Sequence, residues 1–184
     1  VWKSGNEVAA GYSTAYPLAA GGVVVLAAED SFNAVEGATG KVVWSLPWKT
    51  RYGVNAAAPI QSGDKLFISS GYNKGCGLFQ LGAGAPTAIW ENKNLKNQFN
   101  SSVLIDGFLY GIDDDENKKA SLRCVELATG ELKWEEKSIG FGALMAAEGK
   151  LVVQTDKGEL VVAKATPDAF DEIARAQVLS GRCW

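Results

Sequence analysis

The chain has 184 residues, of which 47% are hydrophobic and 21% are charged. This composition is typical of a packed globular protein and excludes a disordered chain. The formal net charge of −3 and the sequence pI near 5.1 leave no general basic surface, which excludes nucleic acid as an expected partner. Histidine is absent, which excludes the commonest general base and the nucleophile pairs that depend on it.

The longest apolar run is "AAGGVVVLAA", residues 19–28. It is far shorter than the roughly 20 residues that cross a bilayer, so the sequence predicts no membrane span. The chain opens on "VWKSG" without a leader pattern and closes on "GRCW". We interpret both ends as cuts in a longer protein.

Tryptophan recurs at intervals of about 44 residues, the period of propeller blades, at Trp2, Trp44, Trp90 and Trp134. This period predicts four units, residues 11–51, 52–96, 97–140 and 141–184, preceded by the end of another unit in residues 1–10. Each unit is predicted to contain four short strands joined by turns that are rich in glycine. The expected fold is therefore all-β, a series of four-stranded antiparallel meanders.

In chain order, the first unit carries the phrase "AVEGATGKVVW", residues 34–44, and the third repeats it as "CVELATGELKW", residues 124–134. The second unit predicts strands at "NAAAPI", "KLFISS", "GLFQLG" and "TAIWEN", and the third at "SSVLI", "FLYGI", "LRCVEL" and "ELKWEE". The fourth unit keeps three such strands but has no Trp at the expected place. Its register predicts a last strand at "ARAQVL", with a helix over residues 168–178 as the alternative.

The repeated phrase itself predicts a strand, a tight turn and a second strand. Gly40 and Gly130 can take the positive φ that such a turn requires. Trp44 and Trp134 then provide large rings that can pack on the neighbouring sheet while the indole N–H donates to an acceptor.

The three cysteines, Cys76, Cys124 and Cys183, have neither metal-ligand nor redox spacing. Cys124 stands where the first unit has Ala34, so we expect it in the core. Cys76 lies between two glycines and is expected in a more exposed loop.

The phrases "AVEGATGKVVW" and "CVELATGELKW" resemble the tryptophan-docking motif of the quinoprotein-like β-propeller family, whose members carry the pyrroloquinoline quinone repeat. The resemblance covers essentially the whole chain, is closest in the first and third units and is nearly lost in the fourth. It implies blades that form part of a seven- or eight-bladed ring. The residues to which it assigns a docking role are Trp2, Trp44, Trp90, Trp134, Gly40 and Gly130.

The resemblance implies two kinds of function. The family includes enzymes that hold pyrroloquinoline quinone and calcium over the axis, and non-enzymatic relatives such as the lipoprotein that helps assemble outer-membrane barrels. The best-known enzymes use an adjacent cysteine pair, which this sequence lacks. We therefore expect a non-catalytic binding or scaffold module, without cofactor, for a protein or carbohydrate partner. The alternative function is that of a quinone-dependent dehydrogenase. The resemblance also implies a periplasmic or extracellular location.

In such a propeller the first strand of each blade lines the axis, and the loops between the second and third strands share one face with the connections between blades. This register places five small polar residues near the axis, where they form either a ligand pocket or a hydrated channel: Ser13, Thr14, Asn55, Asn100 and Ser101. A second candidate is the connection after the first blade, a partner-binding loop or an ordinary charged loop in which Trp48 packs on the next blade. Its residues are Trp48, Lys49, Arg51 and Tyr52.

The run from Asp113 to Asn117 gathers four carboxylates in a predicted loop. Such oxygens can hold Ca²⁺, but the run lacks the alternating ligand spacing and the glycine of a calcium loop. Because two lysines follow at once, the alternative of a solvated loop is preferred. No metal site is predicted.

Four blades make about half a ring, which leaves two apolar blade faces uncovered, and exposing apolar surface costs about 25 cal/mol for each Å². The sequence allows two ways to close the ring. Either further blades of a longer chain cover these faces, or two copies of the chain meet head to tail.

Overall fold

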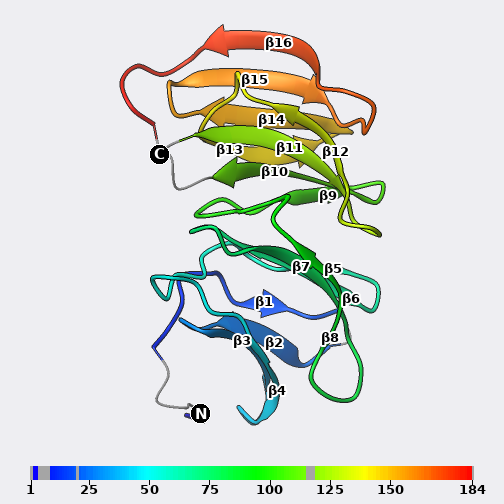
Figure 1. Cartoon of the computed structure of the whole chain (residues 1–184). Coiled ribbons are helices and arrows are strands. Elements are labelled where there is room, and N and C mark those ends of the chain that lie inside the picture. The colour runs from blue at the N-terminus through cyan, green and yellow to red at the C-terminus, as the bar shows by residue number, and fades with distance from the viewer. Residues whose placement is uncertain (1, 4–8, 20, 115–118, 184) are drawn as a thin grey trace.

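The computed structural model describes residues 2–3, 9–19, 21–114 and 119–183. Its strands form four separate four-stranded sheets, each an antiparallel meander in chain order, with no helix among these residues. Accordingly, no helix in the described part of the chain is long and apolar enough to cross a membrane. Figure 1 shows the sheets stacked in chain order, from the first sheet at the bottom to the fourth at the top. The predicted all-β architecture is confirmed.

Each sheet lies inside one of the four predicted units. The first contains β1 (Tyr16–Pro17), β2 (Val23–Ala27), β3 (Ser31–Glu36) and β4 (Val42–Pro47). The second contains β5 (Ile60–Ser62), β6 (Lys65–Ser70), β7 (Gly75–Gln80) and β8 (Thr87–Asn92). The third contains β9 (Val103–Ile105), β10 (Phe108–Asp114), β11 (Ala120–Glu126) and β12 (Leu132–Glu136). The fourth contains β13 (Gly142–Ala147), β14 (Lys150–Thr155), β15 (Glu159–Lys164) and β16 (Asp171–Gln177).

Turns of two residues fix the register of the hairpins β9–β10 and β13–β14. Between β9 and β10, Asp106 and Gly107 have φ values of 49° and 84°, and between β13 and β14, Glu148 and Gly149 have values of 50° and 69°. Two successive residues with positive φ form the turn whose twist matches that of the flanking strands. The turns of the repeated phrase also follow the prediction, because Gly40 has a φ of 75° and Gly130 one of 74°.

The irregular fourth unit ends in a strand, as its register predicts, and the helical alternative for residues 168–178 is wrong. β16 pairs with β15 along its length, and Ala174 lies opposite Val162. The equivalent pairs in the other sheets join Ala34 to Trp44, Leu78 to Trp90 and Cys124 to Trp134. Ala174 therefore stands at the position that carries Trp in the first three sheets.

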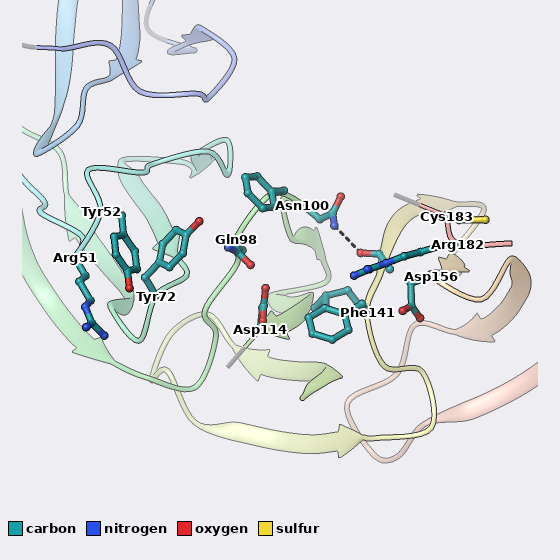
Figure 2. Close-up of a pocket in the computed structure, with 13 residues that line it drawn as sticks. Arg51, Tyr52, Tyr72, Gln98, Asn100, Asp114, Phe141, Asp156, Arg182 and Cys183 are labelled. Carbon is teal, nitrogen blue, oxygen red and sulfur yellow. Dashed lines mark hydrogen bonds between the residues drawn. The ribbon is translucent and has the colours of Figure 1, made fainter. Parts of the chain in front are cut away.

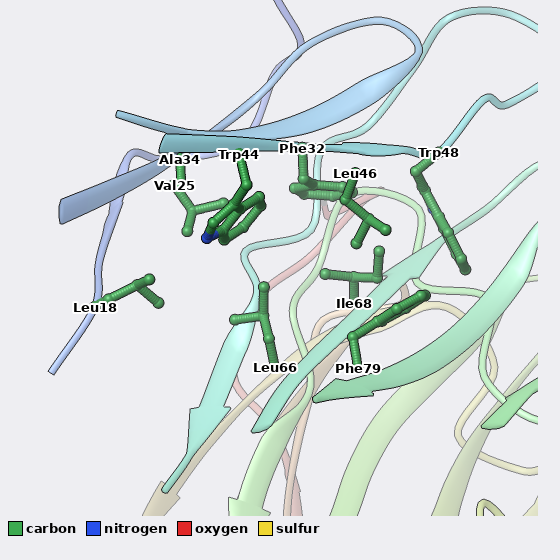
Figure 3. Packing of buried hydrophobic residues seen from close by; sticks show 10 residues of the cluster. All are labelled: Leu18, Val25, Phe32, Ala34, Trp44, Leu46, Trp48, Leu66, Ile68 and Phe79. Carbon is green, nitrogen blue, oxygen red and sulfur yellow. The ribbon is translucent and has the colours of Figure 1, made fainter. Parts of the chain in front are cut away.

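The sheets are held together by apolar clusters that lie between neighbours. Figure 3 shows the first of these, in which Phe32 and Trp44 of the first sheet face Leu66, Ile68 and Phe79 of the second. Phe32 and Leu66 have no exposed surface. Burial of large apolar side chains on both faces of each inner sheet is the main source of stability for such a stack.

Two further clusters join the second sheet to the third and the third to the fourth. Cys124 is fully buried in the latter, as its register predicts. The prediction for Cys76 is wrong: it lies in β7 and is also fully buried. A Cβ on the neighbouring Gly77 would lie 2.8 Å from the Phe79 ring, so the adjacent glycine permits close packing and does not mark a loop.

Three of the recurrent tryptophans, Trp2, Trp90 and Trp134, contact the turn of the following sheet. The Trp90 Nε1 donates to the Leu127 carbonyl over 2.9 Å, and a Cβ on Gly130 would lie 2.8 Å from the Trp90 ring. The Trp134 Nε1 makes the same bond to Thr166 over 2.8 Å. Trp2 donates to the Gly37 carbonyl over 2.8 Å beside Gly40. Each such contact joins the end of one repeat to the next.

Candidate binding pocket at the loop face

A pocket of about 700 Å³ opens on the face formed by the loops between second and third strands and by the connections between sheets. Figure 2 shows it with residues from the second, third and fourth sheets converging on one space. Its lining comprises Arg51, Tyr52, Tyr72, Gln98, Phe99, Asn100, Ile112, Asp114, Phe141, Gly142, Asp156, Arg182 and Cys183. The volume is in the range of pockets that bind small molecules or single side chains.

One wall of the pocket is aromatic. The rings of Tyr52 and Tyr72 meet edge to face with centroids 5.0 Å apart, and the Arg51 guanidinium lies 5.2 Å from the Tyr52 ring centroid. Tyr72 sits in the β6–β7 turn with a φ of 55°, which turns its side chain toward the connection from the first sheet. Tyr52 and Phe99 remain 60% and 62% exposed, so large apolar surface is available to a ligand.

The opposite wall is polar and belongs to the third and fourth sheets. Asn100 donates through Nδ2 to the Gly142 carbonyl over 2.6 Å, the bond drawn in Figure 2. The Cys183 N–H donates to the Asp156 carbonyl over 2.8 Å, which holds the segment after β16 at the rim. Carboxylates of Asp114 and Asp156 and the guanidinium of Arg182 also line the space, so it presents both charges beside the aromatic rings.

The five residues predicted near the axis do not form one pocket, since only Asn100 lies in the lining. Asn55 is fully buried and joins the first two sheets: its Nδ2 donates to the Ala28 and Trp48 carbonyls, and its Oδ1 accepts from Ser70. Ser101 accepts a hydrogen bond from the Ala58 N–H over 2.8 Å. Ser13 is half-buried and Thr14 is exposed, outside the lining. Most of these five residues therefore form hydrogen bonds between blades.

The residues of the predicted partner loop also separate into some that line the pocket and some that do not. Arg51 and Tyr52 line the pocket, whereas Trp48 is 2% exposed and donates to the Ser70 hydroxyl over 3.0 Å. Its ring packs edge to face on Phe79 with centroids 5.9 Å apart, so Trp48 belongs to the interface between sheets. Lys49 is exposed and is not among the lining residues.

Sequence reasoning missed the remaining aromatic residues, Tyr72, Phe99 and Phe141. Each lies just after a second strand or just before a first strand, the two segments that the propeller register places on one face. The register therefore carried the signal, but the aromatic candidates were taken from the connection after the first blade alone.

The acidic run from Asp113 to Asn117 begins differently from the prediction. Asp113 is the sixth residue of β10 and is 2% exposed, so it does not belong to a solvated loop. Its Oδ2 accepts from Lys96 over 2.9 Å and pairs with Arg123 over 3.0 Å. Burial raises the pKa of the Asp113 carboxyl, an effect that both cations counteract. Asp114 lines the pocket, and residues 115–117 lie outside the described residues.

A calcium-bound quinone would need several oxygen ligands close together. Across residues 2–3, 9–19, 21–114 and 119–183, no group of three His, Cys, Asp or Glu side chains is placed to hold a metal ion.

A comparison with protein families gives a match over residues 1–136 to the family described as outer membrane protein assembly factor BamB. The chain belongs to the BamB family. The match includes the first three sheets and the three tryptophans of their fourth strands. The family resemblance expected from the repeated phrases is thereby confirmed.

Solved structures with the same fold share little sequence identity with this chain. A quinohemoprotein alcohol dehydrogenase, ADHIIG, from Pseudomonas putida HK5 has a TM-score of 0.72 at 10% identity, with 97% of this chain and 36% of that chain covered. The WD40 domain of Neurospora crassa Pan2 has a TM-score of 0.66 at 10% identity, with coverage of 94% and 52%. At these identities the likeness shows the β-propeller fold alone.

The computationally designed Ika8 protein has a TM-score of 0.67 at 11% identity, with 88% of this chain and 48% of that chain covered. The BamB-family chain thus spans about half the length of the designed protein. A comparison with curated proteins finds no match.

Proposed function

We propose that this BamB-family chain is a non-catalytic binding module that holds a segment of a protein partner in the loop-face pocket. The observation that supports this most is the aromatic wall of Tyr52 and Tyr72 with Phe99, two of whose rings are more than half exposed. Aromatic and arginine side chains are enriched in protein interfaces and supply most of their binding energy.

The pocket suits one side chain of a polypeptide with its flanking backbone. A volume of about 700 Å³ accepts an apolar anchor against the aromatic wall. The polar wall offers Asn100, Gln98 and the carboxylate of Asp156 to backbone amides on either side of that anchor. A positively charged residue next to the anchor would complement the carboxylate of Asp156.

The family supports the class of partner and the location. Its described role concerns assembly of outer membrane proteins, which favours a protein as partner, and nothing in the comparisons favours a carbohydrate. We propose that the chain acts in the periplasm or outside the cell, where it serves as a scaffold for other polypeptides.

Selection from a displayed random peptide library tests the proposal. Peptides recovered on the immobilised chain are labelled and titrated by fluorescence anisotropy against the wild type, Y52A and F99A. Both residues are at least 60% exposed, so truncation removes pocket surface and leaves the core intact. Each variant is expected to weaken binding by at least tenfold, about 1.4 kcal/mol.

The matched control is Y12A, because Tyr12 is 72% exposed and does not line the pocket. It should bind like the wild type. Peptides that bind Y52A and F99A as tightly as the wild type, or a library that yields no saturable binder, would contradict the proposal.

Titration with pyrroloquinoline quinone and Ca²⁺ separates this function from a dehydrogenase. The melting temperature and the quinone absorption spectrum are expected to stay unchanged. Saturable binding of the quinone would favour the enzymatic alternative.

A further inference from the structure

A second hollow lies beside the loop-face pocket and is lined by the third and fourth sheets and the connection between them. Its volume is about 740 Å³, and Phe141 and Asp156 line both spaces. In Figure 2 these two residues lie across the loop-face pocket from Tyr52 and Tyr72. The Asp156 N–H donates to the Phe141 carbonyl over 2.9 Å, so one hydrogen-bonded pair forms the wall that the two spaces share.

Four positively charged side chains line this second hollow, which we call the basic hollow: Lys119, Arg123, Lys137 and Lys157. Its carboxylates are those of Asp113, Glu135 and Asp156. Two of these carboxylates are already paired, because Lys96 and Arg123 bind Asp113 and Arg123 also binds Glu135. The charges of these two cations and two carboxylates cancel.

The remaining charges of the basic hollow are mostly positive. Lys119, Lys137 and Lys157 are exposed, and the Lys137 side chain is 81% exposed although it lies 3.5 Å from Glu135. Of the described residues that line the hollow, Asp156 supplies the one remaining carboxylate. A cleft with an excess of one sign of charge attracts ligand groups of the opposite sign, so the basic hollow favours an acidic group.

Asp113 brings to the basic hollow a buried oxygen atom without a donor. The residue is 2% exposed, and its Oδ2 is occupied by Lys96 and Arg123. Its Oδ1 accepts no hydrogen bond from the described residues, and it is alone in this among their buried side-chain nitrogen and oxygen atoms. A buried polar atom without a partner is costly, so Asp113 Oδ1 is suited to a donor that a ligand brings.

We infer that the protein partner extends from the loop-face pocket past Phe141 into the basic hollow. There an acidic side chain pairs with Lys137 and Lys157, and a serine or threonine hydroxyl donates to Asp113 Oδ1. A polypeptide is the occupant because the two spaces share a wall, so a chain held in one continues into the other. The partner segment therefore carries an apolar anchor beside hydroxyl and acidic residues. This inference rests on the proposed function and extends it.

The peptides selected on the immobilised chain give the first test. Acidic residues with Ser or Thr close to the apolar anchor should be enriched over the starting library. The tightest such peptide is titrated against K137E/K157E, which reverses two exposed charges and leaves the core intact. Binding is expected to weaken about tenfold at low salt, and by less at high salt because ions screen exposed charges.

The matched control is K41E/K133E. It makes the same change of net charge at two exposed lysines that do not line the basic hollow. It should bind the peptide like the wild type at both salt concentrations.

The hydroxyl is tested on the peptide, which leaves the protein unchanged. Replacement of the peptide Ser or Thr by Ala should weaken binding to the wild type about tenfold, because a hydrogen bond to a charged group is lost. With D113A, whose folding is checked by circular dichroism, the same replacement should change nothing. The comparison on the wild type stands without that variant.

Three results would overturn the inference: peptides without acidic enrichment, equal affinity for the wild type and K137E/K157E, or Ala-substituted peptides that bind as tightly as their parents. If such peptides still bind Y52A and F99A more weakly than the wild type, the proposed function stands and the role of the basic hollow alone is refuted. Saturable binding of oligogalacturonate that K137E/K157E abolishes, while peptide binding is unchanged, would assign the hollow to an acidic sugar instead.

Discussion

Gly130 is a residue at which one added carbon should be costly. Its φ of 74° is unfavourable for any other residue, and a Cβ would lie 2.5 Å from Asn92 Nδ2 and 2.8 Å from the Trp90 ring. G130A is expected to lower the free energy of unfolding by about 2–3 kcal/mol, since backbone strain adds to lost packing. G107A, with a φ of 84° but nothing within 4 Å of its Cβ, should cost only about 1 kcal/mol. Equal losses in urea denaturation would contradict the packing role of Trp90.

The cysteines should differ in reactivity although none is in a disulfide. Burial raises the pKa of the Cys76 thiol to about 12 and that of Cys124 to about 11, so both stay protonated and enclosed at pH 8. Cys183 is partly exposed at the pocket rim. Labelling of the native chain with iodoacetamide is expected at Cys183 alone, and at all three cysteines in guanidinium. Rapid native labelling of Cys76 would show that β7 is not buried.

At the level of single residues, the repeat predicted the environment of residues that have an equivalent in another unit, and it missed the environment of residues that have none. Cys124 could be placed because Ala34 occupies the same position in another unit. Asp113 could not, because its burial depends on Lys96 and Arg123, which approach from a connection and from a neighbouring strand. A run of acidic letters does not reveal that its first member has two cationic partners.

Among the elements, some strands followed the sequence closely, whereas the first strands of the second and third sheets did not. β6 and β8 have the bounds of their predicted segments, because alternation and flanking turns define them. β5 and β9 contain only three residues, fewer than predicted. The backbone before β5 bonds to other blades instead, as the Ala58 N–H does to Ser101. Such bonds between repeats leave no pattern within one repeat.

Strands β11 and β12 are joined by an ion pair with a defined pH dependence. The Arg123 guanidinium donates to Glu135 Oε1 over 2.7 Å, and this bond together with that from Ser121 lowers the pKa of Glu135 to about 2. The lowered pKa means that the stabilisation is complete above the unfolded pKa of about 4.5 and is lost as the pH falls toward 2.

Urea denaturation of the wild type and E135Q at pH 7 and pH 3 checks this pair. The wild type is expected to be more stable by about 1 kcal/mol at pH 7, a modest value because the Glu135 side chain is 24% exposed. The difference should shrink at pH 3, where the carboxylate of the unfolded chain binds a proton. A difference that is independent of pH would show that the charge of Glu135 contributes nothing.

For the whole molecule, the sequence predicted four stacked sheets but not the pocket. The period and the repeated phrases define each blade by local pattern. The pocket arises only when Tyr72 of one sheet, Phe99 of a connection and Phe141 of the next are brought to one face. These residues share no motif, and their meeting depends on the angle between sheets.

Hydrogen–deuterium exchange with and without the tightest selected peptide tests most directly the claim that the loop face holds a polypeptide. The peptide is expected to slow exchange in residues 51–54, 71–74, 98–102 and 141–143, and to leave β4 and β16 unchanged. Slowed exchange confined to the outer strands or to the outer faces of the stack, with no change in those four segments, would contradict it.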